Sequence, residues 1–180
     1  AYLAKDPEYA NFFVDLDPIT DLSQVVRPRA TPLLSEFTDI EGKIHNIWTT
    51  FSRDQVDLNY ANYKVLVAVI DVLFCYIEKG ATLIRLDAIA FIWKEIGTSS
   101  VHLPQTHQLI QLMREVLHEV APEVIIITET NGPHQENISY FGSGEDEAQM
   151  VYNFALPPLL AHSVLNSDTD ALTKWAQTLS

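Results

Sequence analysis

The stretch that decides the fold is Gly80-Ala81-Thr82-Leu83-Ile84-Arg85-Leu86-Asp87-Ala88-Ile89-Ala90-Phe91. Its glycine is a signal for the end of a helix, and the apolar residues after it form a run of strand length. Because residues i and i+2 of a strand point to the same face, Arg85 and Asp87 are predicted to lie together at the carboxyl end of a buried strand. Sheets of α/β proteins build their functional sites at that end, so we expect a site here.

A second apolar run repeats this arrangement. Residues 124–128 are apolar or β-branched, and Glu129 follows them directly. The separation of Asp87 and Glu129 suits one strand–helix–strand crossover between parallel strands. This order is typical of an α/β protein with a parallel sheet. Around these two strands the patterns predict four helices, from Asn62 to Lys79, from Pro104 to about Val120, at 156–165 and at 170–179. They also predict short strands at 47–51 and 150–154 and a long loop at 130–148.

Composition narrows the class of protein. The chain has 24 acidic and 11 basic residues, a formal charge of −13, which opposes broad affinity for nucleic acid or an anionic membrane. No run approaches the ~20 apolar residues that a membrane span needs. Cys75 is the single cysteine, so we expect neither a disulfide framework nor a cysteine-based metal site, and the cytoplasm is the default compartment. Because Ala1 is not an initiator methionine and no signal peptide is visible, we expect an excised piece of a longer chain.

Other polar clusters are less informative. His107 and His118 have no second ligand at helical spacing, so we expect ordinary surface or boundary residues. The acidic run 145–147 could hold a cation, but a solvated turn is favoured because the spacing of a calcium loop is missing. The Arg27-Pro28-Arg29 cluster could grip an anion or form a solvated turn.

Two carboxylates at one sheet edge suggest a specific chemistry. The Arg85 guanidinium is expected to keep Asp87 ionised, and the apolar strand before Glu129 is expected to favour its protonated form. An ionised carboxylate facing a protonated one can carry out glycosyl transfer, because one attacks the anomeric carbon while the other protonates the leaving oxygen. Spacing alone leaves another interpretation open, in which Arg85 and Asp87 form a buried ion pair and Glu129 is an unrelated exposed residue.

Several motifs resemble those of glycoside hydrolase family 13, the α-amylase superfamily. Residues 80–87 are similar to the nucleophile motif of that family, residues 126–129 to its acid/base motif, and residues 55–59 to the motif that closes its inserted B domain. The likeness covers nearly the whole chain, with the motifs in the family's order. Features that resemble the sucrose phosphorylase subgroup are the runs 85–98 and 152–160 and the Arg27-Pro28-Arg29 cluster.

The resemblance implies a fold and a domain division. The chain is expected to be a partial (β/α)8 barrel, an α/β fold. Residues 61–180 would supply the central part of the barrel, about strands four to six with their helices, and residues 1–60 would belong to the B domain. Two family motifs, an Asp/Asn-His motif after strand three and a His-Asp motif with a third carboxylate, are not among the 180 residues, so this piece is expected to be inactive by itself.

The resemblance also implies residue roles. Asp87 would be the nucleophile, Glu129 the general acid/base and Arg85 the partner that orients Asp87. Arg29 matches a position that helps bind phosphate or the acceptor. The implied reaction moves glucose from a small α-glucoside to inorganic phosphate through a covalent glucosyl-enzyme, without a cofactor or a metal.

The chain departs from sucrose phosphorylases on the phosphate and acceptor side. Phe91 stands where that subgroup has tyrosine, and Asn131 where it has histidine. The run Glu129-Thr130-Asn131 with Pro133-His134 is closer to glucosylglycerate phosphorylases. We therefore expect Phe91, Asn131 and His134 to contact substrate or phosphate, and the acceptor to be fructose, a sugar phosphate or glycerate.

Two alternatives remain at this point. The same carboxylates would serve a retaining α-glucoside hydrolase or transglucosidase, and the 180 residues could be a non-catalytic fragment. If the parent protein is a phosphorylase, a hydrolase or a transglucosidase, the expected partner is a small carbohydrate. Exposed edge strands of an open half-barrel could also pair with another copy, giving a homo-oligomer.

Overall fold

The parallel sheet predicted from the two apolar runs is present. In the computed structural model, which describes residues 1–179, β3 (Leu83–Leu86), β4 (Ile125–Thr128) and β5 (Met150–Val151) form a three-stranded sheet in that order. Both strand pairs are parallel, and β3 and β4 end together because Leu86 lies beside Thr128. The third strand is shorter than predicted, since its pairing with β4 stops at Val151.

The helix before β3 has the predicted signals at both ends. Helix α1 (Tyr63–Glu78) begins after Asn62, whose side chain accepts a hydrogen bond from the Lys64 amide at 3.1 Å. It ends at Lys79, and Gly80 follows with a φ of 90°, a left-handed conformation that glycine adopts without strain. Both boundaries are confirmed.

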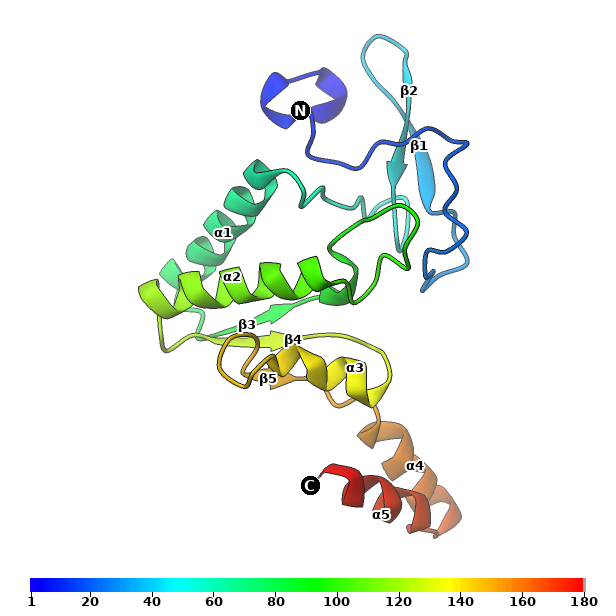
Figure 1. Ribbon diagram of the computed structural model, residues 1–180, viewed down its shortest axis with the longest axis vertical. Coiled ribbons are helices and arrows are strands. Elements are labelled where there is room, and N and C mark those ends of the chain that lie inside the picture. The colour runs from blue at the N-terminus through cyan, green and yellow to red at the C-terminus, as the bar shows by residue number, and fades with distance from the viewer. Residues whose placement is uncertain (180) are drawn as a thin grey trace.

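The crossover between β3 and β4 is helix α2 (Pro104–Val120), with proline in its first turn as predicted. Figure 1 shows α1 and α2 on the same side of the sheet. Val116 is only half-buried and Val120 is exposed, so the buried stripe of α2 is narrower than predicted. The core between the helices and this face of the sheet contains Leu73, Ile84, Met113, Leu117, Ala121, Val124, Ile126 and Ala148.

The residues before α1 form an antiparallel hairpin of β1 (Leu34–Thr38) and β2 (Ile44–Trp48), outside the parallel sheet. The strand predicted at 47–51 was misplaced, because the turn after Thr38 sets the register and the chain leaves the ladder after Trp48. The hairpin packs on a small core of its own with Val25 and Leu33. The division into two domains near residue 60 stays a prediction.

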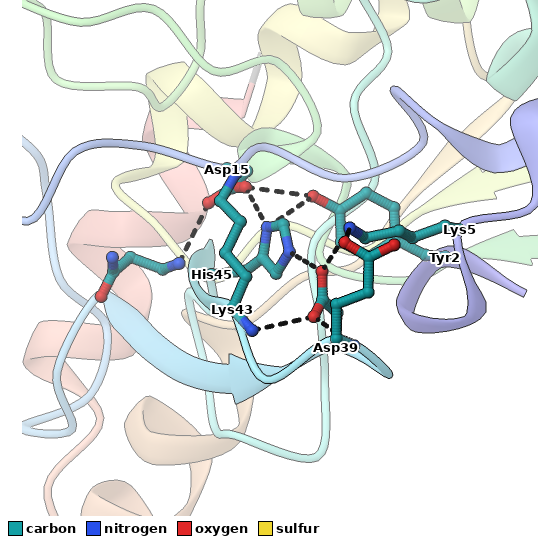
Figure 2. Close-up of polar contacts among 8 residues, drawn as sticks. Tyr2, Lys5, Asp15, Asp39, Lys43 and His45 are labelled. Carbon is teal, nitrogen blue, oxygen red and sulfur yellow. Dashed lines mark hydrogen bonds and ion pairs between the residues drawn. The ribbon is translucent and has the colours of Figure 1, made fainter.

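A polar cluster ties the first residues of the chain to this hairpin (Figure 2). His45 Nδ1 lies 2.6 Å from Asp15 Oδ2, and His45 Nε2 lies 3.2 Å from Asp39 Oδ2. Tyr2 donates a hydrogen bond to Asp15 at 3.1 Å, and Lys5 forms an ion pair with Asp39 at 3.3 Å. Burial and the nearby Asp15 carboxylate raise the pKa of Tyr2 to about 12.

The segment predicted as a long loop contains short helical turns, α3 (His134–Ile138) and a 3-10 turn at Ser139–Phe141. These elements are only one turn long, so they leave little periodic signal. The final helices, α4 (Leu156–Asn166) and α5 (Asp170–Ala176), pack against each other and lie beyond the sheet (Figure 1). No helix within residues 1–179 is both long enough and apolar enough to cross a bilayer.

Candidate active site

The two strand-end carboxylates lie at the same rim of the sheet. Leu86 and Thr128 lie side by side in the sheet, and Asp87 follows the first while Glu129 follows the second. The Glu129 amide donates a hydrogen bond to the Leu86 carbonyl at 3.0 Å. Asp87 is 66% exposed as a side chain, whereas Glu129 is 18% exposed. The register of the parallel pair therefore brings together two carboxylates in different environments, as the sequence predicts.

The Arg85 guanidinium lies beside both carboxylates. Its Nη1 atom is 2.5 Å from Asp87 Oδ1, and its Nη2 atom is 3.9 Å from Glu129 Oε2. Although desolvation opposes the shift, the charges of Asp87 and Glu129 raise the pKa of Arg85. The interpretation of Glu129 as an unrelated exposed residue is therefore wrong, because the same arginine faces it and Asp87.

Two further groups fix this arrangement. The Ala88 amide donates a hydrogen bond to Glu129 Oε2 at 2.9 Å, and Ala88 has the left-handed φ of 47°. Left-handed backbone at a non-glycine residue is uncommon and concentrates at functional sites. The guanidinium carbon of Arg85 also lies 5.4 Å from the centre of the Tyr152 ring, so Arg85 is held between an aromatic ring and the carboxylates. Tyr152 immediately follows β5 and opens the quoted run 152–160, but its contact with Arg85 was not predicted.

A cavity of about 330 Å³ opens beside Glu129. Three other residues predicted to bind substrate or phosphate line it: Arg29, Phe91 and Asn131. Arg27 takes a different part, because its guanidinium donates hydrogen bonds to the carbonyls of Ala30 at 3.1 Å and Thr31 at 2.6 Å. The arginine cluster is thus divided between one residue that holds the loop and one that faces the cavity.

Asp87 lines a neighbouring cavity of about 220 Å³. The two cavities share Phe51, Ala88 and Phe91 as lining residues. The rings of Phe51 and Phe91 meet edge to face, with their centres 5.5 Å apart. This aromatic pair, together with Ala88, is therefore a wall that the cavity at Asp87 and the cavity at Glu129 share.

His134 is not brought together with the other predicted site residues. It lines a separate cavity of about 500 Å³ with Tyr152 and Asn153, and its ring is edge-on to Trp175 at 6.5 Å. Tyr152 is the link to the rest of the site, because it lines this cavity and also contacts Arg85.

An ion pair next to the aromatic wall was missed by sequence reasoning. Lys94 Nζ lies 2.6 Å from Asp57 Oδ1, and the Lys94 side chain is only 5% exposed, whereas Asp57 also lines the cavity at Asp87. Lys94 belongs to the quoted run 85–98 and Asp57 to the run 55–59, but neither resemblance pointed to their pairing.

The acidic run 145–147 is also different from the prediction. Glu147 is 3% exposed, and it accepts hydrogen bonds from His107 Nδ1 at 2.9 Å and Gln111 at 3.1 Å. The expectation of a solvated turn is wrong for this residue, because two side chains of α2 pair with it. Within residues 1–179, no three His, Cys, Asp or Glu side chains are grouped so that they could hold a metal ion.

The sequence was compared with protein families and with curated proteins. The alpha amylase catalytic domain family matches residues 2–178. The chain is 54% identical over 179 residues to a glucosylglycerate phosphorylase of Escherichia coli (strain K12) and 56% identical over 179 residues to one of Allomeiothermus silvanus, covering 99% of this chain and 32% of the relative in both cases. The chain thus spans about a third of the length of these curated relatives.

A solved structure has the same fold. The sucrose 6F-phosphate phosphorylase of Thermoanaerobacter thermosaccharolyticum superposes with a TM-score of 0.82 at 22% identity, over 96% of this chain and 37% of that one. The arrangement of strands and helices is therefore that of part of a family 13 barrel, as the sequence predicts.

Proposed function

The chain belongs to the alpha amylase catalytic domain family, and on this premise we propose that the natural protein carrying it is a retaining α-glucosyl phosphorylase. It transfers glucose from an α-glucoside, of the sucrose or glucosylglycerate type, to inorganic phosphate. The observation that carries the proposal is the position of Arg85, which faces both Asp87 and Glu129 at one rim of the sheet.

We infer the reaction from the placement of the two carboxylates at one rim of the sheet. Asp87, paired with Arg85, attacks the anomeric carbon and forms a covalent bond to glucose, while Glu129 gives its proton to the departing oxygen. Phosphate then attacks the same carbon, the bond to Asp87 breaks, and Glu129 takes back a proton. Two displacements at one carbon retain its configuration. Only these side chains and phosphate take part, so the scheme needs no cofactor.

The choice of phosphate as acceptor is supported by the cavity beside Glu129. Among residues 1–179, Arg29 is the single cationic side chain that lines this cavity, and a guanidinium matches the geometry of a phosphate. Phe91 and Asn131 would contact the leaving group in the same space. For His134, which lines a separate cavity, we propose a contact with the far part of the acceptor only.

The leaving group is proposed to be glycerate rather than fructose. The two relatives above 50% identity named here are both glucosylglycerate phosphorylases, and Asn131 and Phe91 depart from the sucrose phosphorylase pattern. Hydrolysis is the alternative within the same chemistry, because water could replace phosphate at the glucosyl-enzyme.

The test uses the whole natural protein that carries this sequence. It is incubated with glucosylglycerate or sucrose, with and without inorganic phosphate, and both glucose 1-phosphate and free glucose are measured. We expect glucose 1-phosphate from glucosylglycerate only when phosphate is present. Free glucose formed at a rate that phosphate does not change would reject the proposal in favour of a hydrolase. A covalent glucosyl adduct trapped on a residue other than Asp87 would reject the residue assignments.

A further inference from the structure

The aromatic wall that lines both cavities is hydrogen-bonded through its main chain to the buried ammonium group of Lys94. Lys94 donates hydrogen bonds to the Phe91 carbonyl and, at 3.1 Å, to Thr50 Oγ1, in addition to its ion pair with Asp57. The Trp48 ring covers the ammonium group, with 5.6 Å between Nζ and the ring centre. All three donors of the Lys94 ammonium therefore have acceptors, which is the condition for burying this charge.

Each partner of Lys94 is itself fixed. Asp57 Oδ2 accepts a hydrogen bond from the Thr50 amide at 2.6 Å, and Asp57 Oδ1 accepts one from the Thr50 hydroxyl at 2.9 Å. The Trp48 indole donates to the same hydroxyl at 3.0 Å. Burial lowers the pKa of Lys94, while the Asp57 carboxylate acts in the opposite direction.

The network holds both halves of the wall through the main chain. Phe91 is held by its own carbonyl, and Phe51 by the amide and hydroxyl of its neighbour Thr50. These two aromatic residues come from segments about forty positions apart, and their rings are in direct contact. A shift of either main chain would move one ring relative to the other and change the shape of both cavities.

We propose that Lys94 is a positioning residue that keeps the Phe51–Phe91 wall in place and so favours capture of the glucosyl-enzyme by phosphate over capture by water. This inference rests on the proposed function. Lys94 touches neither substrate nor the reacting atoms. It acts on the competition between acceptors, because a wall that fits the bound acceptor also limits the space for water at the anomeric carbon.

The first test replaces Lys94 with methionine, which keeps the length and apolar stem but removes the charge. Lys64→Met, at an exposed position of α1, is the matched control. With glucosylglycerate and fixed phosphate, the ratio of free glucose to glucose 1-phosphate is expected to rise about ten-fold in Lys94→Met, since small displacements in an active site have effects of this size. It should stay unchanged in the control. An unchanged ratio in Lys94→Met would overturn the proposal.

A second variant separates positioning from folding. Lys94→Met alone leaves the buried Asp57 carboxylate without its counterion, which destabilises the fold. Lys94→Met/Asp57→Asn removes both charges and keeps an acceptor for Thr50, so its thermal stability should return toward wild type. The altered product ratio should persist, because the Phe91 carbonyl has still lost its donor. Recovery of both stability and product ratio would mean a structural role only, and would overturn the proposal.

Hydrogen exchange keeps the inference independent of the assigned reaction. If the wild-type protein forms no glucose 1-phosphate, the proposed function fails. The wall is then judged by deuterium uptake in peptides that cover residues 88–95. Faster uptake there in the double variant, with the rest of the protein unchanged, supports a Lys94 tether. Equal uptake in the double variant and wild type would overturn it.

Discussion

The Ala88 amide and the Glu129 carboxylate are joined by a hydrogen bond of 2.9 Å across the rim of the sheet. Ala88 directly follows Asp87, so this bond couples the main chain beside one carboxylate to the side chain of the other. Ala88 has a left-handed φ of 47°. This conformation costs energy at alanine, and such backbone is concentrated at functional sites.

Substitutions at Ala88 test the need for this conformation. Ala88→Val should lower the free energy of unfolding by about 1–2 kcal/mol, because a β-branched side chain collides with the main chain at positive φ. Ala88→Gly should stay within about 1 kcal/mol of wild type, since glycine adopts this conformation readily but loses more freedom on folding. Urea unfolding measures both. A valine variant as stable as the glycine variant would mean that the left-handed turn is not required.

The strand ends at the site could be predicted because three local signals agree. A glycine ends α1, an apolar run follows, and the charged residues come after the run, so the carboxyl end of β3 can be located without knowing the rest of the fold. The parallel pairing with β4 then follows from the length of the crossover, which leaves room for α2. Asp87 and Glu129 are therefore predictable neighbours, whereas their roles came from the family resemblance and stay a proposal.

The walls of the site could not be predicted, because they depend on contacts between distant segments. Phe51 and Phe91 are in direct contact and are joined a second time through the network around Lys94, and no local pattern marks that lysine as buried. The position of Glu147 is a similar case. An acidic residue beside two others reads as solvated, and only the packing of the 130–148 segment on α2 places it against His107. His134 follows Glu129 closely in sequence, yet α3 carries it to another cavity.

Glu129→Gln should separate the role of acid from that of nucleophile. With an α-glucoside whose leaving group needs a proton, its rate should fall about 10²- to 10⁴-fold. With α-glucosyl fluoride, whose leaving group needs no proton, formation of the glucosyl-enzyme should stay near the wild-type rate. Asp87→Asn should be inactive with both substrates. Equal losses of Glu129→Gln on the two substrates would contradict its assignment as the acid.

Tyr152 should act on the reaction through Arg85. Tyr152→Leu removes the ring face beside the guanidinium and should lower kcat about two- to ten-fold with little change in KM, since the contact is a cation–π interaction of ordinary size. Tyr152→Phe keeps the ring and should remain near wild type. Steady-state kinetics of both variants measure the effect. A phenylalanine variant as impaired as the leucine variant would assign the effect to the hydroxyl group instead.

The pair of His107 and Glu147 should be important for stability. His107→Phe keeps an aromatic ring at 4.6 Å from Tyr140 but removes the nitrogen that faces the buried Glu147 carboxylate. Its free energy of unfolding should fall by about 2 kcal/mol, the cost of leaving Glu147 Oε2 without its donor while Gln111 still pairs with Oε1. Glu147→Gln, which still accepts a bond and carries no charge, should lose less. The order of the two variants in urea unfolding is the measurement, and the reverse order would contradict this account.

The cluster around His45 predicts how stability depends on pH (Figure 2). Hydrogen bonds to Asp15 and Asp39 raise the pKa of His45 in the folded protein. A raised pKa means that the folded state binds the proton more tightly than the unfolded state does. The contribution of His45 to the free energy of unfolding is therefore complete below pH about 6.5 and is lost as the pH rises through the folded-state pKa. Although burial of Asp39 opposes it, bonds from the Lys43 amide and His45 lower the pKa of Asp39. Its contribution is therefore lost as the pH falls below about 4.

The measurement is urea unfolding between pH 5.5 and 8.5. Wild type should lose stability across this range through His45, whereas His45→Gln should start less stable and change less with pH, because glutamine keeps polar atoms near Asp15 but cannot take up the proton. His118→Gln, at an exposed position of α2, is the control and should follow the wild-type curve. If the stability of His45→Gln changed with pH as steeply as that of wild type, another group would control the pH dependence between 5.5 and 8.5. The bonds between His45 and the two aspartates would then contribute little to the stability of the hairpin.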